Sequence, residues 1–361
     1  MNTAIIGCGL IANMHVQAIQ SIGQKLSIVI DHNLAKAREF AKQYGVSKWA
    51  VDYQDALVDN IDCVHICTPP ALHYEMIKAA LFAGKHVICE KPLVLKNKQA
   101  VELFQLAQEK HLIHAVNFNV RFYEACKEAQ QIIQSQSFGQ PLIIHGSYQQ
   151  EYHIPPTEAS WRYNPELAGP MRAVTEIGSH WIDLARYLTG FEVEKVSASF
   201  ANFSPDRIIQ NDLLYKANKN DSDKIIVDSE DAAIISLQFS NKAIGTVLLS
   251  EISHGRSNAL AIEVIGENGS IWWNAETPNQ ITQAAKPKGV SIKQYAFSGA
   301  YPETFSTFFK AVYDQISDQD NRRINYPTFR DGLINTMICN AIYESAQNNA
   351  GWVPVPTIPG E

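Results

Sequence analysis

An acid and a lysine stand side by side at the end of a short apolar run. Residues 87–89 are apolar or β-prone, Glu90 and Lys91 follow them, and Pro92 prevents the strand from continuing. In an open parallel sheet the carboxyl ends of the strands face the ligand crevice. A lysine in that place can stabilise charge on a substrate oxygen, although the motif alone is equally compatible with a solvated charge in a loop.

A histidine with a carboxylate on each side forms a second chemical grouping. Glu176, His180 and Asp183 have the i, i+4 and i+7 spacing that places side chains on one face of a helix. Such a histidine can accept a proton while an acid fixes its tautomer. The grouping is also compatible with a core histidine beside a capping acid. A carboxylate–histidine metal site is disfavoured because no third cluster of strong ligands lies nearby, and we expect no metal.

A glycine-rich turn near the N-terminus has the pattern of a dinucleotide-binding loop. A short apolar strand over 3–6 leads into Gly7 and Gly9, and a helical pattern over 13–22 follows Ala12. The first glycine permits a tight turn, the second lets a pyrophosphate approach the backbone, and the small alanine lets the helix pack close to the strand. The helix N-terminus then offers N–H groups to the phosphates.

An acid closes the next strand at the distance expected for a ribose contact. Residues 26–30 are mostly apolar, and Asp31 follows them roughly 20 residues after the glycine turn. A carboxylate here, without an adjacent arginine, favours NAD, while Arg38 in the next helix keeps NADP open. Asp31 and Asn33 are also both suited to cap that helix, which is the structural alternative for Asp31.

The elements that must position these residues alternate between strand and helix. We expect further strands over 62–67 and 112–118, and helices over 33–44, 53–59, 71–83 and 97–110. This alternation predicts a doubly wound parallel sheet. His73 falls in the first turn of its helix, near the strand ends, where it could contact a cofactor, although a surface histidine is at least as well supported.

The second half of the chain loses this rhythm. A long strand over 142–148 is followed by predicted strands over 193–203, 232–239, 243–250, 260–265 and 270–273. Their short connections predict antiparallel neighbours, and the polar run over 218–222 predicts a surface loop. We therefore predict an α/β chain with an N-terminal Rossmann domain over 1–120. A C-terminal α+β domain over 121–361 is expected to contain an open, mostly antiparallel sheet.

Composition argues against several classes of function. The 361 residues carry a formal net charge of -7 and no basic run longer than Arg322 and Arg323, so we expect no nucleic-acid partner. No long apolar span is present, so we expect no membrane association. The six cysteines are scattered without paired spacing, which indicates a reducing compartment and a cytoplasmic location.

Four motifs together resemble those of the glucose–fructose oxidoreductase, inositol 2-dehydrogenase and rhizopine-catabolism family, called Gfo/Idh/MocA. They are Gly7-x-Gly9-x-x-Ala12, Thr68-Pro69-Pro70 with His73, Glu90-Lys91-Pro92 and Phe118-Asn119-x-Arg121-Phe122. The similarity covers essentially the whole chain. It implies an NAD(P)-dependent oxidoreductase acting on CH–OH groups, with a homodimer or homotetramer formed through the C-terminal sheet.

The resemblance also implies roles for individual residues. Lys91 would lie beside the nicotinamide and the reacting carbinol, and His180 would be the acid/base. This chain departs from the family pattern twice, because residues 168–170 replace a glycine triplet and Glu176 stands where aspartate is usual. The extra methylene keeps the charge but moves it. The expected cofactor contacts are Gly7, Gly9, Leu10, Ile11, Ala12, Asp31, His32, Thr68, Pro69, His73, Glu90, Lys91, Asn119 and Arg121.

The expected reaction is reversible oxidation of a secondary alcohol on a small sugar, polyol, cyclitol or sugar derivative. Hydride would pass to the nicotinamide, His180 would take the hydroxyl proton, and Lys91 would hold the oxygen. Two other functions stay open: an NAD-dependent glycosidase that oxidises its substrate transiently, and a non-catalytic NAD-sensing regulator on the same fold. The expected substrate contacts are Tyr148, Gln150, Trp161, Arg162 and Asp183, and His153 is a further candidate for substrate hydroxyls.

Overall fold

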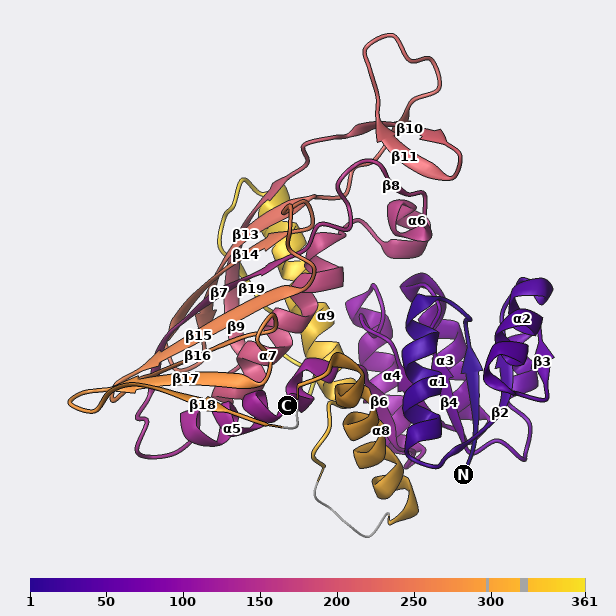
Figure 1. Cartoon of the computed structure of the whole chain (residues 1–361), viewed down its shortest axis with the longest axis horizontal. Coiled ribbons are helices and arrows are strands. Elements are labelled where there is room, and N and C mark those ends of the chain that lie inside the picture. Colours follow the sequence, from indigo (N-terminus) through magenta and orange to yellow (C-terminus); the bar gives the residue numbers. More distant parts are fainter. Residues whose placement is uncertain (297–298, 319–323, 361) are drawn as a thin grey trace. The chain divides into compact units, whose positions relative to one another are not determined.

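The computed structural model describes residues 1–296, 299–318 and 324–360, which divide into two units (Figure 1). The first unit comprises Met1–Phe122, Ala300–Thr336 and Ile358–Gly360, and the second comprises Tyr123–Gly299 and Met337–Thr357. The domain boundary at residue 120 stays a prediction, because a spatial grouping does not by itself identify a functional domain. Arg322 and Arg323 lie outside the described residues.

A six-stranded sheet forms the centre of the first unit. Its order is β3-β2-β1-β4-β5-β6, and all neighbouring strands are parallel, which confirms the predicted doubly wound sheet. The chain leaves β1 towards β2 on one side and returns to β4 on the other, so the carboxyl ends of β1 and β4 flank the switch point where such sheets bind ligands. The strands are β1 (Asn2–Ile6), β2 (Lys25–Ile30), β3 (Trp49–Ala50), β4 (Cys63–Ile66), β5 (His86–Cys89) and β6 (His114–Val116).

Helices connect these strands nearly where the sequence predicts them. The expected helix over 53–59 is a 3-10 turn, and the helix over 71–83 is preceded by a 3-10 turn, Pro70–Leu72, that overlaps its expected start. Helix α2 begins at the cap Asn33 and ends at Gly45, whose φ of 68° is left-handed. The helical elements are α1 (Leu10–Ser21), α2 (Leu34–Tyr44), η1 (Tyr53–Ala56), η2 (Pro70–Leu72), α3 (His73–Phe82), α4 (Asn97–Glu109), η3 (Asn119–Phe122) and α8 (Tyr301–Ser317).

Helix α8 is a part of the first unit that the sequence did not reveal. Its apolar residues recur with helical spacing at Phe305, Phe308, Phe309 and Val312, and all four are buried in one cluster with residues of α1. A segment that resumes at Ala300, 178 residues after Phe122, therefore completes the core of this unit. Helix α9 (Phe329–Gln347) follows it along the chain.

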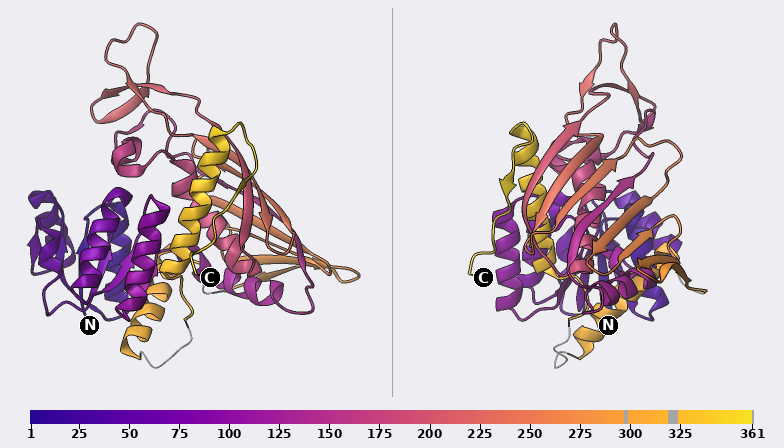
Figure 2. Two further views of the ribbon diagram at one scale, coloured as in Figure 1. Left: turned by 180° about the vertical axis from the view of Figure 1, so that it is seen from behind. Right: turned by 90° about the vertical axis from the view of Figure 1, so that its left-hand side faces the viewer.

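A nine-stranded sheet dominates the second unit, and Figure 2 shows it from two further sides. Its order is β18-β17-β16-β15-β7-β14-β13-β9-β19, and only β7 and β14 run parallel, which confirms the predicted mostly antiparallel sheet. Its strands are β7 (Pro141–Gln149), β9 (Val193–Ala201), β13 (Ala232–Phe239), β14 (Ile244–Ser250), β15 (Ala259–Gly266), β16 (Ser270–Asn274), β17 (Gln280–Ala285), β18 (Gly289–Gln294) and β19 (Val353–Pro354).

Helices α5 (Glu124–Ile133) and α7 (Ser179–Thr189) pack together against this sheet. The indole Nε1 of the fully buried Trp181 donates to the carbonyl of Ala261 on β15 at 3.0 Å. A Cβ on Gly146 would lie 2.9 Å from that same Nε1, so the glycine lets the tryptophan reach the sheet. The anchor fixes the helix that carries His180.

A smaller, unpredicted sheet completes the second unit. Its order is β12-β10-β11-β8, with β8 (Thr157–Glu158), β10 (Asp206–Gln210), β11 (Leu213–Lys216) and β12 (Ile225–Ile226). The polar run over 218–222 lies in the connection between β11 and β12, as expected for a loop. Within the part of the chain that is described, none of the helices is long and apolar enough to cross a bilayer.

Candidate active site

The glycine turn of the first unit contains two glycines, and they differ in what surrounds them. Gly7 has a φ of 94°, and a Cβ there would lie 2.7 Å from the carbonyl oxygen of Cys67. Gly9 precedes α1 with an ordinary negative φ, and a Cβ on it would meet no atom of the described residues within 4 Å. The fold therefore requires Gly7, whereas the space beside Gly9 is open for a phosphate group at the start of α1. These features fit a dinucleotide.

Asp31 is held beside this turn by backbone amides. Its Oδ2 accepts the N–H of Cys8 and its Oδ1 accepts the N–H of Asn33, both at 3.0 Å, and the side chain is only 5% exposed. The side chain of Asn33 caps α2 by accepting the N–H of Lys36, so the alternative that Asp31 is the cap is wrong. A fixed carboxylate at the end of β2 fits a ribose contact, and His32 beside it is exposed.

His73 is buried, which makes the surface alternative wrong. Its Nε2 lies 2.8 Å from the carbonyl oxygen of Thr68, and its Nδ1 lies 3.0 Å from that of Pro92. Burial lowers the pKa of His73. The imidazole thus links the strand-end loops after β4 and β5, and any effect on a cofactor runs through those loops.

Glu90 is buried at the end of β5 and faces several donors. Its Oε2 accepts the backbone N–H of Lys91 at 3.2 Å, and its Oε1 accepts from Asn117 and lies 2.8 Å from Nε2 of His15. Burial alone would raise the pKa of Glu90, but the contacts with His15 and Asn117 outweigh it and lower that pKa. The carboxylate is therefore ionised immediately before the lysine.

The predicted contacts Asn119 and Arg121 anchor the turn that carries them. The side-chain amide of Asn119 donates to Oγ1 of Thr304 at 2.7 Å, and a guanidinium nitrogen of Arg121 lies 2.7 Å from Oδ1 of Asp331. Both contacts join η3 to segments that return to the first unit late in the chain. Contact with the nicotinamide stays a prediction for both residues.

In the second unit the helix through Glu176 and His180 is not regular. A π-helical turn, Val174–Gly178, carries Glu176 and runs directly into α7, which carries His180 and Asp183. A π turn has i→i+5 hydrogen bonds, so the regular α-helix assumed for the i, i+4, i+7 spacing does not run through Glu176. His180 and Asp183 are both buried. Such turns are frequent at functional sites, and the sequence pattern did not reveal this one.

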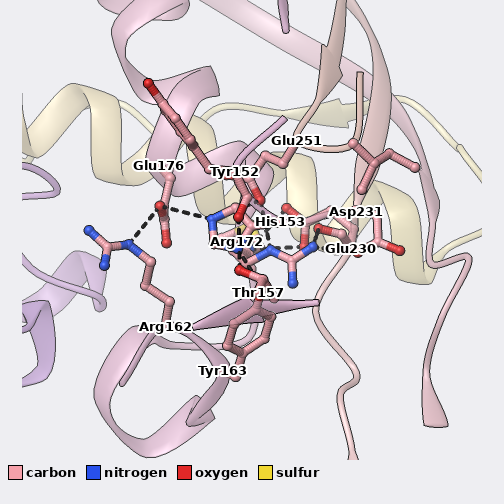
Figure 3. A network of polar contacts seen from close by, with 12 residues as sticks. Tyr152, His153, Thr157, Arg162, Tyr163, Arg172, Glu176, Glu230, Asp231 and Glu251 are labelled. Atoms are coloured by element: carbon pink, nitrogen blue, oxygen red, sulfur yellow. Dashed lines mark hydrogen bonds and ion pairs between the residues drawn. The ribbon is translucent and has the colours of Figure 1, made fainter. Parts of the chain in front are cut away.

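Glu176 carries the contacts that connect it to two other candidates (Figure 3). The Nε of Arg162 donates to its Oε2 at 3.0 Å, and Nε2 of His153 lies 3.7 Å from the same oxygen. The guanidinium of Arg162 also lies 4.7 Å from the ring centre of Trp161. Three residues predicted at separate places in the sequence, Glu176, Arg162 and His153, therefore form one polar cluster.

A buried charged network that the sequence did not reveal lies behind this cluster (Figure 3). Arg172 is fully buried, and its Nε donates to Oε2 of Glu251 at 2.7 Å while another of its nitrogens donates to Asp231. Arg207 donates to the same Asp231 oxygen at 3.1 Å. Both guanidiniums lie over the ring of Tyr163, at 5.0 and 5.1 Å. The acids flank β13 and β14, so only strand pairing brings them to the arginines.

Burial raises the pKa of two glutamates in and beside this network. Burial raises the pKa of Glu251, and Oε2 of Glu251 lies 3.9 Å from Nε2 of His153. Burial also raises the pKa of Glu230 to about 7, although its oxygens accept the backbone N–H groups of Arg172 and Val174. Protonation of this part of the unit is therefore sensitive to conditions near neutral pH.

Three of these residues also have the spacing of metal ligands. Ligand atoms of His153, Glu176 and Glu251 lie within 4.8 Å of one another. However, Arg162 and Arg172 already donate to the two carboxylates, and a cation would have to compete with both guanidiniums. The donor set fits a metal poorly, and the absence of a metal stays a prediction.

The remaining substrate candidates belong to β7 and the residue after it. The hydroxyl of Tyr148 and the side-chain amide of Gln150 both donate to Oδ1 of Asn258. Asn258 thereby orients two side chains that can contact hydroxyl groups, and no sequence pattern indicated this residue. Their contact with a substrate stays a prediction.

Two family models match most of the chain. The model described as an oxidoreductase family with an NAD-binding Rossmann fold matches residues 1–118. The model of the C-terminal alpha/beta domain of that oxidoreductase family matches residues 130–355. Both halves are therefore recognised independently.

Individual relatives extend this similarity over the full length. Levoglucosan dehydrogenase of Pseudarthrobacter phenanthrenivorans is 30% identical over 395 residues, which cover 99% of both chains. The NAD(+)-dependent scyllo-inositol 2-dehydrogenase of Bacillus subtilis is 29% identical over 273 residues, covering 74% of this chain and 72% of that protein. A solved structure of levoglucosan dehydrogenase with NADH and L-sorbose is 29% identical with a TM-score of 0.91, and 99% of each chain is covered.

Proposed function

Because the chain belongs to the Gfo/Idh/MocA family of oxidoreductases with an NAD-binding Rossmann domain, we propose that it oxidises a secondary alcohol of a sugar, cyclitol or sugar derivative. The family membership confirms the expected family, enzyme class and NAD cofactor. The observation that carries the substrate proposal is the full-length similarity to a levoglucosan dehydrogenase in a chain that retains Lys91 and His180.

The residues of the first unit supply the cofactor site. Gly7 makes the turn, the open space at Gly9 admits the pyrophosphate, and the carboxylate of Asp31 accepts from the ribose hydroxyls. NAD, when bound, supplies the hydride acceptor. Thr68 and Pro92 lie in loops that His73 connects, so the imidazole fixes the rim of this site.

Two residues are proposed to act on the reacting hydroxyl. His180 takes its proton, and Lys91 stabilises the negative charge that develops on its oxygen. Glu176 orients His180 while Arg162 fixes the carboxylate of Glu176. Glu90 is ionised beside Lys91, and the charge of Lys91 is among the causes that lower the pKa of Glu90.

A substrate with several hydroxyl groups suits the polar side chains of the second unit. Arg162 and His153 offer donors, Glu176 offers acceptors, and Tyr148 and Gln150 are oriented by Asn258. Trp161 lies against Arg162 and presents an aromatic surface, which commonly packs on the apolar face of a sugar ring. This combination supports a sugar or cyclitol rather than an apolar alcohol.

We also propose a homodimer or homotetramer through the nine-stranded sheet. Strand pairing places Ile234 opposite Leu248 and Ile143 beside Ile244, and all four side chains are exposed. Neighbouring partners in a sheet share a face, so these residues form an apolar patch of the kind that protein interfaces cover. A cytoplasmic location is the accompanying proposal, supported by six cysteines that are all unbridged.

Absorbance of NADH tests the proposed reaction. The purified chain is given NAD, or NADP in parallel, with levoglucosan, myo-inositol, scyllo-inositol and a panel of hexoses and sugar acids. An increase in NADH absorbance with at least one polyol supports the proposed dehydrogenase activity. If NAD binds but every polyol leaves it oxidised, the dehydrogenase is rejected. Nitrophenyl glycoside cleavage would then favour the glycosidase, and its absence the regulator.

A further inference from the structure

We propose that a buried chain of hydrogen bonds in the first unit positions Glu90 and, through it, the catalytic Lys91. We call this chain the relay; it consists of Thr3 of β1, His15 of α1, His65 of β4 and Tyr313 of α8. The inference rests on the proposed function only for the role of Lys91 at the substrate oxygen. Neither histidine has any part in that reaction as described above.

The relay is continuous and shielded from water. Oγ1 of Thr3 lies 2.7 Å from the hydroxyl of Tyr313, and that hydroxyl lies 2.9 Å from Nε2 of His65. The two Nδ1 atoms of His65 and His15 are 2.8 Å apart, and Nε2 of His15 is 2.8 Å from Oε1 of Glu90. Thr3, His15 and His65 have no exposed surface, and Tyr313 is 2% exposed.

The chemistry of the groups requires a donor where the relay meets Glu90. The carboxylate of Glu90 only accepts, so Nε2 of His15 must carry a proton. Burial, followed by the neighbouring His15, lowers the pKa of His65 well below its usual value, so His65 is neutral. Where the two Nδ1 atoms meet, one must donate and the other accept, and the hydroxyls of Tyr313 and Thr3 can each do either. The order of the relay is therefore fixed at its Glu90 end.

Glu90 connects the relay to Lys91 through a hydrogen bond. Its Oε1 also accepts from the side-chain amide of Asn117, so two donors fix one oxygen. The other oxygen accepts the backbone N–H of Lys91. The carboxylate therefore has a single orientation, and the peptide that begins the lysine is bonded to it.

If the relay only stabilised the fold, apolar side chains in the place of its histidines would serve the core better. The rings of His15 and His65 both pack on Phe309, at 4.8 and 4.7 Å between centroids, where apolar side chains would avoid the desolvation of polar groups. Buried polar chains of this kind stabilise less than well-packed apolar residues but define one arrangement. The arrangement that this chain defines ends at Glu90.

Two substitutions of His15 separate its two contacts. In His15→Gln, the amide nitrogen can occupy the place of Nε2 and still donate to Glu90. In His15→Asn, the shorter amide reaches only the place of Nδ1, so it can contact His65 and loses Glu90. Tyr313→Phe is a third variant, which keeps the ring and breaks the relay two links away from Glu90.

The expected result is a split between turnover and binding. We expect His15→Asn to lower kcat by about 10-fold or more, because small displacements of a catalytic group cost this much. KM and the dissociation constant of NAD should stay unchanged, and His15→Gln should retain most of the wild-type kcat. A merely structural histidine would give equal losses in both variants, or none in either, and that result overturns the proposal.

A spectroscopic readout tests the relay without any substrate. In protein labelled with 15N-lysine, the Lys91 amide is assigned by its loss in Lys91→Arg, and its proton shift reports the bond to Glu90. We expect the resonance to move in His15→Asn and in Tyr313→Phe, and to stay in His15→Gln. If Tyr313→Phe and any folded His15→Asn protein leave it unmoved, the relay does not position the motif. Because no turnover is needed, this outcome is independent of whether the proposed alcohol oxidation is found.

Discussion

The Nε atom of Arg162 lies 3.0 Å from Oε2 of Glu176, the residue that stands where the family pattern has aspartate. The contact comes from the 3-10 turn Trp161–Tyr163, and the glutamate comes from the π turn that precedes α7. The longer side chain of Glu176 thus ends at the guanidinium of Arg162. A substitution of either residue should therefore also change the position of the other side chain.

Glu176→Asp withdraws the carboxylate from Arg162 by one methylene. We expect kcat with the best polyol to fall by about 10-fold or more, because a misplaced catalytic group loses its alignment. Arg162→Ala should cause a loss of similar size, and the double variant should lose little more than either single variant. Steady-state kinetics check this, with Arg256→Ala as the control because Arg256 forms an exposed pair with Glu276. Additive losses would show that the two residues act separately.

Lys91→Ala and His180→Ala should each reduce turnover by about 100-fold or more, the usual size of a lost acid, base or charge-stabilising group. NAD binding should be retained, because neither side chain makes the glycine turn or the ribose contact. Titration of NAD by calorimetry, beside NADH production, separates the two effects. Lys98→Ala is the matched control on an exposed part of α4. Loss of NAD affinity in either variant would move that residue to the cofactor site.

Asp31→Asn should weaken NAD binding by about 10-fold, which corresponds to about 1.4 kcal/mol. The amide keeps the shape but replaces one acceptor oxygen with a donor and removes the charge that repels a 2′-phosphate. The ratio of NADP to NAD affinity should therefore rise. Dissociation constants of both cofactors check the result, with the exposed Glu39→Gln on α2 as control. An unchanged ratio would argue that Asp31 serves only the backbone amides of Cys8 and Asn33.

Stability should depend on pH through Glu230. Burial raises the pKa of Glu230 from 4.5 to about 7, so the folded state keeps a proton that the unfolded chain releases in this window. Its contribution is fully present below pH 4.5 and is lost as the pH rises through about 7. Glu230→Gln cannot ionise, so its stability relative to the wild type should rise across this window by on the order of 3 kcal/mol. Thermal unfolding at several pH values checks this, with exposed Glu109→Gln as control. A constant difference between variant and wild type would contradict it.

Ile234→Lys with Leu248→Lys places two charges on the exposed face of the nine-stranded sheet. If this face joins copies of the chain, the double variant should sediment as a smaller species than the wild type while remaining folded. Analytical ultracentrifugation measures the mass, and circular dichroism checks the fold. The matched control is Val290→Lys, at an exposed position on β18 at the sheet edge. An unchanged mass would place any interface elsewhere.

The sequence predicted most of the first unit because its signals are local. Apolar runs, the glycine turn and helix stops such as Gly45 lie within a few residues of the structure they determine. Helix α8 has equally regular spacing, but its partners in α1 are almost 300 residues away, and no local pattern connects Phe305 or Phe309 to them. The burial of His73 was missed for the same reason, because its partners include a carbonyl 19 residues further on.

The site of the second unit was predictable only in part. Glu176 and His180 were predicted as site residues because they are close in sequence and chemically conspicuous, and their roles stay a prediction. Arg172, Asp231 and Glu251 were not, since strand pairing between β13 and β14 brings the two acids together and an arginine about 60 residues earlier completes the set. The π turn before α7 was also invisible, because it does not change the residue types that a helix uses.

The two glycines of the first turn are placed there for different reasons. A side chain at Gly7 would strike the backbone of Cys67, so that position records how the polypeptide folds upon itself. A side chain at Gly9 would enter open space, so the fold places no demand on that position. One glycine of the turn is therefore explained by the packing of the protein itself, and the other leaves room for the bound cofactor.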